Sequence, residues 1–537
     1  MPSPVSFAHT VILVLSVLLL GCTMTTLAAE SPHRERRILY NSDGSNALAE
    51  HWMWSAHRGA MTLTEKQDLI EESIDEIAAA GVDTLSVVAW EKFMPNLASS
   101  DVCPDTYRLK RLQYLDMVEA GRIPIEIMID RCRRHALEFI ATFRMNDKHA
   151  SPPARFIVEN PEVVLVGQQV NYAHDAVRTT FLAFMEEFLT RHDVDGIQFD
   201  YLRNPNLFPD GTGAAHAHLL TDLTRRARTL LDAAAKRRGR SRLMLGVRVP
   251  QTLEECRALG FDVGAWIREG LIDWVVPSDF FYTDLNARTE DFVALTAGTS
   301  CRIYPALHPV TCVEDNVGIN GLEHYRAAAR NFYAFGASGI EAYNYQYHWG
   351  RRIGRTPPWS SVNWPAALGY LGQLRNPEQL VRFDRHYRFF RLWSTAPTGF
   401  AKDDRIQLDV SQKDPEGRFR FRVAEDLEDP TLRAILHFKA AGLSDGEDLE
   451  ITLNGMPVPD RWVIRKWFSR GRPETQGRPL PPFHEYTIDL GRGPQRPPIM
   501  HGDNELFARL LHNTDPTKNP VTIDEVEMYV YVRQPKP

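Results

Sequence analysis

The chain has 537 residues, of which 43% are hydrophobic and 24% are charged, and its formal net charge at pH 7 is -7. This length is too great for one ordinary core, and it fits a barrel of about 250 to 350 residues plus a smaller domain. The acidic balance and the lack of a long basic run exclude nucleic acid as an expected partner.

The first 29 residues have the pattern of an export signal. The apolar run from Val11 to Leu20 is long enough for a signal peptide and too short to cross a membrane as a helix. Its end, Leu19-Leu20-Gly21-Cys22, resembles the bacterial lipobox, in which Cys22 becomes the lipid-bearing first residue. The alternative is an ordinary signal peptide cut near Ala28-Ala29. Both predict an exported protein of the cell envelope, in the first case with a lipid anchor in a membrane. Residues 30–48 are polar and predict a tether or an approach strand.

Between residues 49 and 384 short β-like runs alternate with segments of helical periodicity. Thr64-x-x-Gln67 predicts a capping box for one helix, and Asp175 is expected to cap another. Eight strands joined by crossover helices favour a closed (β/α)8 TIM barrel, in the α/β class. The eight runs are His51-Trp54, Asp83-Trp90, Glu138-Met145, Gly196-Arg203, Leu243-Pro250, Trp274-Phe280, Arg302-Pro309 and Gly339-Gln346.

Residues 385–537 have a different pattern, in which short strands alternate between apolar and polar side chains. The predicted strands are Arg405-Val410, Arg418-Val423, Arg433-Phe438, Leu449-Leu453, Tyr486-Leu490, Glu505-Leu511 and Val521-Val532. Asn454-Gly455 is a strong hairpin signal between two such strands. The segment therefore predicts a C-terminal antiparallel β-sandwich. Such a domain either binds carbohydrate or has a structural role beside the barrel.

The five cysteines after Cys22 form no Cys-x-x-Cys pair, which indicates neither a zinc site nor a dense disulfide framework. One bridge between Cys301 and Cys312 is compatible with the sequence. No phosphate-binding loop or dinucleotide fingerprint follows a predicted strand, so no cofactor is expected. A Gly-x-Ser-x-Gly nucleophile elbow is also missing.

Two aspartates stand near the ends of predicted strands four and six, which is where barrel enzymes carry catalysis. Glycoside hydrolysis needs one ionised carboxyl group as nucleophile or base and one protonated group as general acid. We expect Asp200 in the first role and Asp279 in the second, with Arg203 or Arg144 holding Asp200 ionised. Glu341 in strand eight is the rival acid, and Asp147 and Glu91 are further candidates that fit better as hydroxyl ligands or loop caps.

Polar and aromatic side chains concentrate at the same strand ends. Aromatic faces stack on sugar rings, and polar groups fix sugar hydroxyls. The predicted carbohydrate-binding residues are Trp54, Arg144, Asn146, Asp147, His149, Tyr201, Arg203, Arg248, His308, Asn344, Tyr347 and Trp349.

Three motifs carry a family resemblance. Phe143-Arg144-Met145-Asn146-Asp147-x-His149, Asn171-Tyr172-Ala173-His174 and Val194 to Arg203 resemble the glycosyl hydrolase-like 10 domain family, over roughly residues 50 to 350. The resemblance implies an exported TIM-barrel protein active on carbohydrate. The use of Asp on strands four and six is also similar to the α-galactosidase-like clan. The end of strand seven, Leu307-His308-Pro309, lacks the acid of the clan that places Glu on strands four and seven.

Two other functions remain open. A metal-dependent hydrolase on the same barrel would use His149, His174, His308 and His348 as ligands. Against it, no His-x-His occurs at strand one, and His216-Ala217-His218 lies in a helical pattern, where the two rings point to different faces. The second alternative is a protein that binds carbohydrate without cleaving it.

Overall fold

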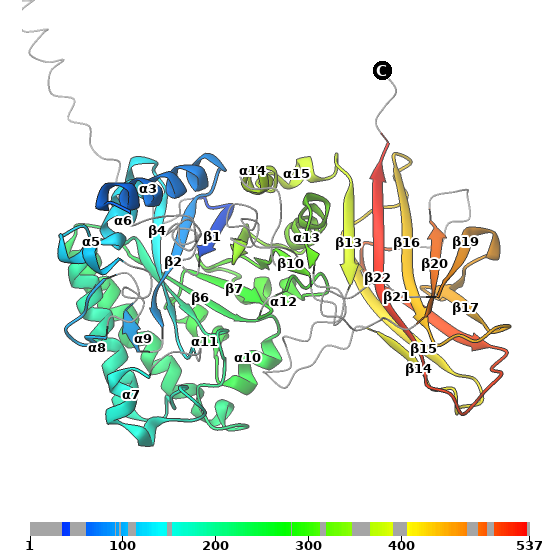
Figure 1. Cartoon of the computed structure of the whole chain (residues 1–537), viewed down its shortest axis with the longest axis horizontal. Helices are drawn as coiled ribbons and strands as arrows, with labels where there is room; N and C mark the ends of the chain where they lie inside the picture. The colour runs from blue at the N-terminus through cyan, green and yellow to red at the C-terminus, as the bar shows by residue number, and fades with distance from the viewer. Residues whose placement is uncertain are drawn as a thin grey trace, which may run out of the picture.

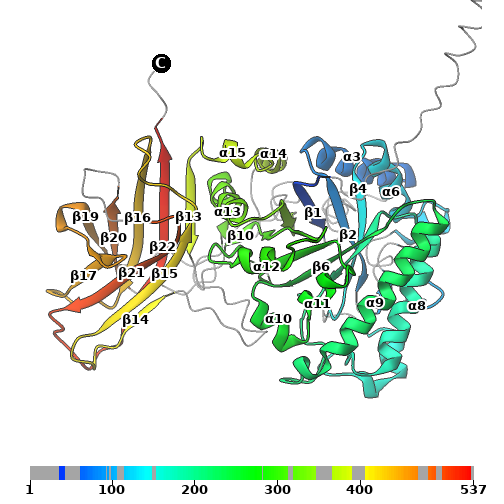
Figure 2. The same cartoon turned by 180° about the vertical axis from the view of Figure 1, so that it is seen from behind.

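The computed structural model divides into two parts that lie side by side, a parallel sheet with its helices and a set of antiparallel strands (Figures 1 and 2). The described residues are 35–42, 61–91, 93–95, 98–105, 114–147, 153–280, 282–311, 318–345, 366–389, 405–469, 482–490 and 499–533.

The first part contains a ten-stranded sheet in the order β8-β7-β6-β5-β4-β2-β1-β12-β9, with the short β3 paired to β2. All neighbours in this order are parallel, whereas β3 is antiparallel to β2. A parallel sheet with helices on its outside fits an α/β barrel. The strands are β1 (Ile38–Ser42), β2 (Thr84–Glu91), β3 (Met94–Pro95), β4 (Glu138–Arg144), β5 (Gly196–Asp200), β6 (Met244–Pro250), β7 (Trp274–Ser278), β8 (Arg302–Ile303), β9 (Ala306–Leu307) and β12 (Ile340–Tyr343).

The two strands at the ends of this order come from one short stretch of chain. β8 pairs with β7, and β9 pairs with β12. Between them, the N–H of Tyr304 donates to the carbonyl of Val275 (2.9 Å), and the carbonyl of Pro305 accepts from the N–H of Glu341 (3.1 Å). The stretch 302–307 is therefore hydrogen-bonded to strands on both of its sides.

The first strand lies elsewhere than predicted. β1 falls inside residues 30–48, for which the sequence allowed a tether or an approach strand, and it pairs with both β2 and β12. Asn41 and Ser42 of this strand are fully buried. Because both side chains are polar, the sequence pattern did not indicate a core strand there. The predicted strand His51-Trp54 lies outside the described residues. Each of the seven later predicted runs overlaps a strand of the sheet. The run Arg302-Pro309 holds both β8 and β9, and β3 was not predicted.

Helices cover the outside of the sheet, and α8 and α9 lie side by side on it (Figures 1 and 2). The helices are α3 (Leu63–Ala79), α5 (Leu115–Glu119), α6 (Pro124–Arg134), α7 (Arg155–Glu159), α8 (Asp175–Arg191), α9 (Gly213–Arg237), α10 (Leu253–Leu259), α11 (Val263–Arg268), α12 (Thr289–Leu295), α13 (Leu322–Ala334), α14 (Ala366–Gln373) and α15 (Pro377–Leu380).

Two predicted helix starts are shifted by one or two residues. The capping box of α3 is formed by Thr62 and Glu65 and not by the predicted pair at Thr64 and Gln67. Helix α8 has His174 as its N-cap, and Asp175 is its first residue, where a carboxylate still favours the positive end of the helix dipole.

The second part is a pair of antiparallel sheets. One has the order β13-β22-β16-β20-β19, with β14 paired to β22, and the other has the order β15-β21-β17-β18. Asn454 and Gly455 both have positive φ (48° and 78°) in the predicted hairpin. The strands are β13 (Arg385–Phe389), β14 (Ile406–Leu408), β15 (Glu416–Val423), β16 (Leu432–Ala441), β17 (Asp448–Leu453), β18 (Met456–Pro457), β19 (Val463–Phe468), β20 (Phe483–Asp489), β21 (Gly502–Leu511) and β22 (Val521–Val532); β13 and β19 were not predicted.

Helix α13 joins the two parts through a buried asparagine. The Asn331 amide donates to the carbonyls of Leu285 (3.1 Å) and Arg422 (2.8 Å), and its oxygen accepts from the N–H of Ala424 (2.8 Å). Arg422 also pairs with Glu290 of α12 (2.7 Å). The contact between the two parts therefore includes specific polar bonds that are closed to solvent at its centre.

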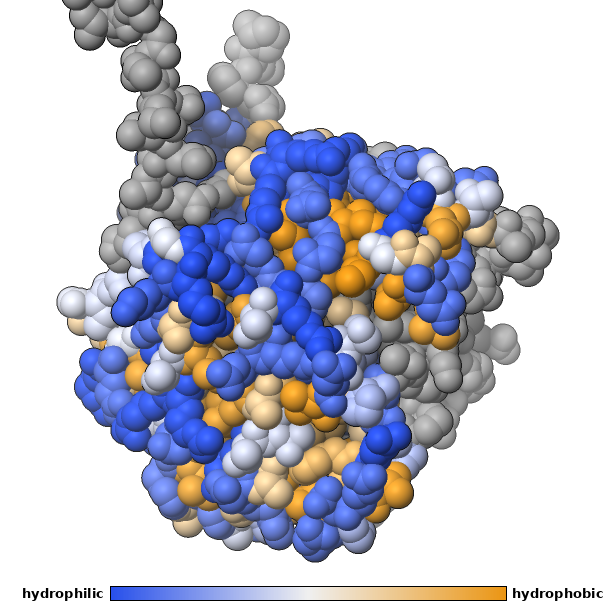
Figure 3. Space-filling model, turned by 90° about the vertical axis from the view of Figure 1, so that its left-hand side faces the viewer, coloured by the Kyte–Doolittle hydropathy of each residue, from blue (hydrophilic) through white to orange (hydrophobic). Residues whose placement is uncertain are grey.

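Hydrophilic residues cover most of the surface at the end of the first part, and hydrophobic residues form separate patches between them (Figure 3). No helix in the described ranges is long and apolar enough to span a membrane. Cys301, one half of the bridge that the sequence allowed, is a free buried thiol, and Cys312 lies outside the described residues.

Candidate active site

Asp200 ends β5, and its carboxylate is fully buried. One carboxylate oxygen, Oδ1, accepts hydrogen bonds from Arg248 Nη1 (2.9 Å) and from the N–H of Leu202 (3.0 Å). The other, Oδ2, accepts from the hydroxyl of Tyr343 (3.2 Å). Three donors, one of them charged, fix the orientation of both oxygens.

Arg248 connects three strands at this point. Its Nη1 pairs with Asp200, and its Nη2 donates to the main-chain carbonyls of Asp279 (2.9 Å) and Phe280 (3.1 Å). The guanidinium carbon lies 3.6 Å from the ring centroid of Tyr343, which is cation–π contact distance. Arg248 was predicted as a carbohydrate contact, and its observed partners make it the group that positions Asp200.

Tyr343 is the third member of this cluster. Its burial and the charge of Asp200 raise the pKa of the phenol, so the hydroxyl keeps its proton and remains a donor to the carboxylate. Tyr343 was not among the predicted site residues. Its position two residues after Glu341 in β12 was the available signal, because alternate residues of a strand share a face.

Ser278 and His308 support Arg248 from the other side. Arg248 Nε donates to Ser278 Oγ (3.2 Å), while the serine hydroxyl donates to the carbonyl of Asp279 (2.6 Å). His308 Nε2 lies 3.1 Å from the same Oγ. Burial and the charge of Arg248 hold the pKa of His308 well below its ordinary value, so the imidazole is neutral, and we assign the proton to Nε2.

Asp279 follows β7 and is also buried. Its Oδ1 accepts a hydrogen bond from the N–H of Tyr282 (3.1 Å). The ladder pairs Asp200 with Arg248, and Arg248 with Val276, so Asp279 lies further along its strand than the residue in line with Asp200. The two predicted catalytic aspartates are thus both neighbours of Arg248, one through its carboxylate and one through its main chain.

Glu341 lies in the interior of the sheet, beneath this cluster. Its Oε2 accepts from the amide of Gln198 (2.8 Å), which in turn accepts from the indole N–H of Trp274 (3.0 Å), and Asn41 is its other hydrogen-bonding neighbour. Burial raises the pKa of Glu341 to about 7. A fully buried carboxyl group near neutral pH therefore exchanges a proton within the physiological range.

Glu341→Gln is expected to change how stability depends on pH. In the folded protein the raised pKa keeps the proton on Glu341 between about 4.5, the ordinary value, and about 7. The stability contributed by the neutral carboxyl is complete below pH 4.5 and is lost as the pH rises through 7. The variant lacks this titration, so its unfolding free energy relative to the wild type should rise by up to about 3 kcal/mol from pH 4.5 to 8. Urea unfolding across that range measures the difference, and a constant difference would contradict the assignment.

A second group of charges lies beside the cluster. Arg144 Nη1 donates to Glu91 (3.0 Å) and to Asp147 (3.2 Å). Arg203 Nε lies 3.9 Å from Asp147, and its guanidinium carbon lies 5.0 Å from the ring centroid of Phe280. Both arginines lie near Asp147, whereas the arginine that pairs directly with Asp200 is Arg248. Glu91 and Asp147 were the further candidate acids, and both pair with Arg144.

Tyr201 has a packing role and not the predicted substrate contact. It is fully buried on the helix side of the sheet, with its ring centroid 4.7 Å from Phe261 and 5.6 Å from Trp266. Adjacent residues of a strand point to opposite faces, so a Tyr next to the inward-facing Asp200 must point outward.

Asn146 was predicted to contact the substrate, but its side chain links two loops of the structure. Its amide donates to the carbonyls of Val170 (3.1 Å) and Asn206 (2.8 Å), and its oxygen accepts from the N–H of Val170 (2.8 Å). The side chain ties together the loops after β4 and β5. Asn344, by contrast, follows β12 directly, with φ of 51° and its N–H donating to the carbonyl of Asn41 (3.1 Å).

Several predicted residues lie outside the part of the chain that the structure describes: Cys22, Trp54, His149, Tyr347 and Trp349. Of the four histidines that a metal site would use, His174 caps α8 and His308 contacts Ser278, while His149 and His348 are not described. Within the described ranges, no group of three or more His, Cys, Asp or Glu side chains could hold a metal ion.

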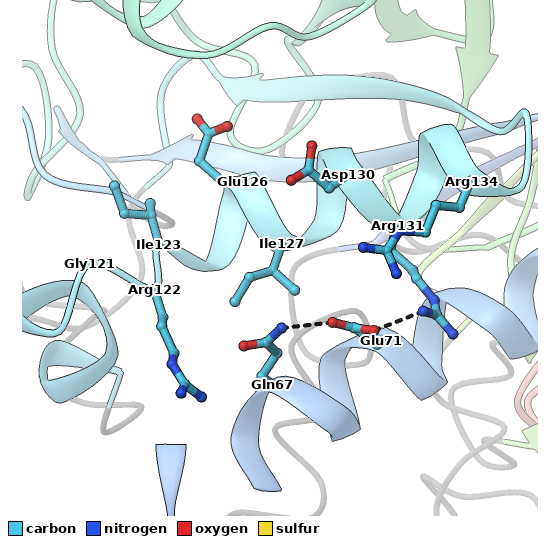
Figure 4. A pocket seen from close by; sticks show the side chains of 10 residues that line it. All are labelled: Gln67, Glu71, Gly121, Arg122, Ile123, Glu126, Ile127, Asp130, Arg131 and Arg134. Atoms are coloured by element: carbon cyan, nitrogen blue, oxygen red, sulfur yellow. Dashed lines mark hydrogen bonds and ion pairs between the residues drawn. The ribbon is translucent and has the colours of Figure 1, made fainter. Parts of the chain in front are cut away.

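A cavity of about 250 Å³ lies between α3 and α6, away from the strand ends (Figure 4). Glu71 accepts hydrogen bonds there from Gln67 (2.8 Å) and Arg131 (2.8 Å). Its acids and arginines neutralise one another on the helix side of the sheet. The cavity contributes nothing to the Asp200 cluster.

No protein-family model and no curated protein matches the sequence. The structure is similar to the PgaB (BpsB) glycoside hydrolase domain of Bordetella bronchiseptica (10% identity, 64% of this chain and 99% of that chain, TM-score 0.38). An α-amylase of Anoxybacillus (11%, 95% and 100%, 0.36) and α-L-fucosidase isoenzyme 2 of Paenibacillus thiaminolyticus (11%, 67% and 51%, 0.39) are also similar. These neighbours are glycoside hydrolases, and at such identity the likeness concerns the fold alone.

Proposed function

We propose that the chain is a glycoside hydrolase that cleaves O-glycosidic bonds of a poly- or oligosaccharide. The observation that supports this most is the buried Asp200 carboxylate, held by Arg248, Tyr343 and the N–H of Leu202 at the C-terminal end of a parallel strand. A carboxylate with both oxygens already oriented can attack a sugar carbon or activate water without reorganisation. Asp200 is the proposed nucleophile or base.

Asp279 is the proposed general acid. Asp279 lies beyond the end of β7, and its own main-chain carbonyl accepts a hydrogen bond from Arg248. Glu341, by contrast, accepts a hydrogen bond from Gln198 in the interior of the sheet. Arg144, Asp147, Arg203, His308 and Asn344 are proposed to position sugar hydroxyls, together with Trp54, His149, Tyr347 and Trp349 of the predicted set.

The proposed barrel is closed through residues 302–307. The bonds of this stretch to β7 on one side and to β12 on the other support that closure. Closure brings the C-terminal ends of all strands around one mouth, which gives a substrate a single site at the Asp200 cluster. Membership of the glycosyl hydrolase-like 10 family, export of the chain and a lipid anchor at Cys22 belong to the same proposal and rest on the sequence motifs.

The test is the release of reducing ends from a panel of bacterial, algal and plant glycans, with Asp279→Asn beside the wild type. Loss of the general acid should lower turnover of a glycan at least about a hundredfold. A dinitrophenyl glycoside of the same sugar should lose far less, because its leaving group departs without a proton. Asp262→Asn is the matched control, since Asp262 caps α11 through an oxygen that asparagine retains.

Equal losses on both substrates would place the acid elsewhere, with Glu341 and Asp147 as the next candidates. No release from any glycan, together with binding to one, would replace hydrolysis by carbohydrate binding alone. Loss of activity on addition of a chelator would favour metal-dependent hydrolysis.

A further inference from the structure

Trp467 in β19 is exposed in a way that other tryptophans of the described chain are not. Trp90, Trp266 and Trp274 are buried and Trp462 is partly buried, whereas 60% of Trp467 is accessible. Its neighbour Phe468 is 38% accessible and stacks on Phe483 of β20, with ring centroids 5.1 Å apart. β19 ends its sheet on the side away from the first part (Figures 1 and 2). Leaving an indole in water forgoes the stabilisation that its burial would give, which points to a ligand for the ring.

Polar groups beside Trp467 are held in place. The ladder sets His484 directly opposite Trp467 and Tyr486 opposite Arg465, so these four side chains share one face. Arg465 Nη1 donates to the carbonyl of Glu447 (2.8 Å), and the same nitrogen lies 3.3 Å from an Asp448 carboxylate oxygen.

His484 supplies the adaptable group on this face. Burial and the charge of Arg465 lower its pKa, so at neutral pH the imidazole is uncharged and has one donor and one acceptor nitrogen. Sugar hydroxyls both donate and accept hydrogen bonds, and a neutral imidazole beside an open indole face suits them.

The charges around the ring are balanced. Arg465 pairs with Asp448, and the His484 imidazole is uncharged at neutral pH. A balanced surface lacks the positive field that nucleic acid or an anionic membrane needs.

We propose that the accessible part of this face, formed by Arg465, Trp467 and His484 beside the buried Tyr486, binds an uncharged glycan chain, with one sugar ring stacked on Trp467. The class of ligand rests on the proposed function. Binding at this face does not require that the Asp200 site turn the ligand over.

The experiment is affinity electrophoresis of the full chain through gels that contain xylan, laminarin, galactomannan, pullulan or dextran. At least one of these neutral polysaccharides should retard the wild type, and Trp467→Ala should weaken that retardation roughly tenfold or more, as expected for an anchoring tryptophan. Trp467→Phe should keep a large part of the binding, because it retains an aromatic face. Tyr531→Ala is the matched control, since Tyr531 is 41% accessible on β22, three strands away in the sheet order.

Two readouts separate this inference from the proposed function. Hydrolysis of a short soluble substrate should be equal in Trp467→Ala and the wild type, and Asp200→Asn should be retarded as the wild type is. Retardation by none of the five polysaccharides, equal retardation of Trp467→Ala, or an equal loss in Tyr531→Ala would each overturn the inference, whatever the activity. So would dimerisation in sedimentation that Trp467→Ala abolishes, because a second copy would then occupy the face.

Discussion

Asp200→Asn is expected to lower the turnover of a cleaved glycan by at least about a thousandfold while the protein stays folded. Asparagine fills the same volume and its oxygen can still accept from Arg248 and Leu202, but it cannot form a glycosyl bond or take a proton. The substrate KM should change little, because the lost interaction belongs to the transition state. Initial rates and urea unfolding of the same preparation measure both quantities.

Asp195→Asn is the matched control for this prediction. Asp195 directly precedes β5 at its other end, where it accepts from the N–H of Phe139 (2.8 Å) and pairs with Arg240 (2.8 Å). Removing this charge should reduce stability and leave turnover per folded molecule within a few fold. Similar turnover losses in both variants would mean that Asp200 supports the fold and does not carry the chemistry.

Arg248→Met is expected to destabilise the protein by about 3 to 5 kcal/mol. The substitution leaves the Asp200 carboxylate buried without its cation and the carbonyls of Asp279 and Phe280 without their donor. An unpaired buried charge is far more costly than a missing pair. The double variant Arg248→Met, Asp200→Asn should therefore be more stable than Arg248→Met alone, in urea unfolding at neutral pH.

Arg225→Met tests whether burial is the cause. Arg225 pairs with Glu269 at 2.7 Å, a distance close to that of the Arg248 pair, but half of its side chain is exposed. Surface pairs contribute only about 0 to 1 kcal/mol, so this variant should remain close to the wild type. A loss as large as that of Arg248→Met would show that the effect comes from arginine in general.

The sequence predicted the first sheet well because its strands are short apolar runs between helices of clear periodicity. β1 was not predicted as a strand of the barrel because Asn41 and Ser42 are polar, although both are buried in the interior. In β5 the alternation of side chains already separated the inward Asp200 from the outward Tyr201, and the prediction did not apply it.

The hydrogen-bond partners of Asp200 could not be predicted from the sequence of any one strand. Arg248 and Tyr343 reach it from β6 and β12, and only the register of neighbouring strands brings those residues to one level. Asp200 itself was found from its place at a strand end. The arginine that pairs with it could not be chosen among Arg144, Arg203 and Arg248 without the register.

The three hydrogen bonds of Asn331 bear on how the chain evolves and melts. An exchangeable accessory domain is joined to its neighbour by a flexible linker and contacts it mainly through water. Here Asn331, which is 1% exposed, forms hydrogen bonds with main-chain groups of both parts. Cutting the chain between the two parts would leave those carbonyl and amide groups open to solvent. Calorimetry should therefore show one cooperative transition, and the antiparallel sheets should be inherited together with the parallel one and not shuffled among unrelated enzymes.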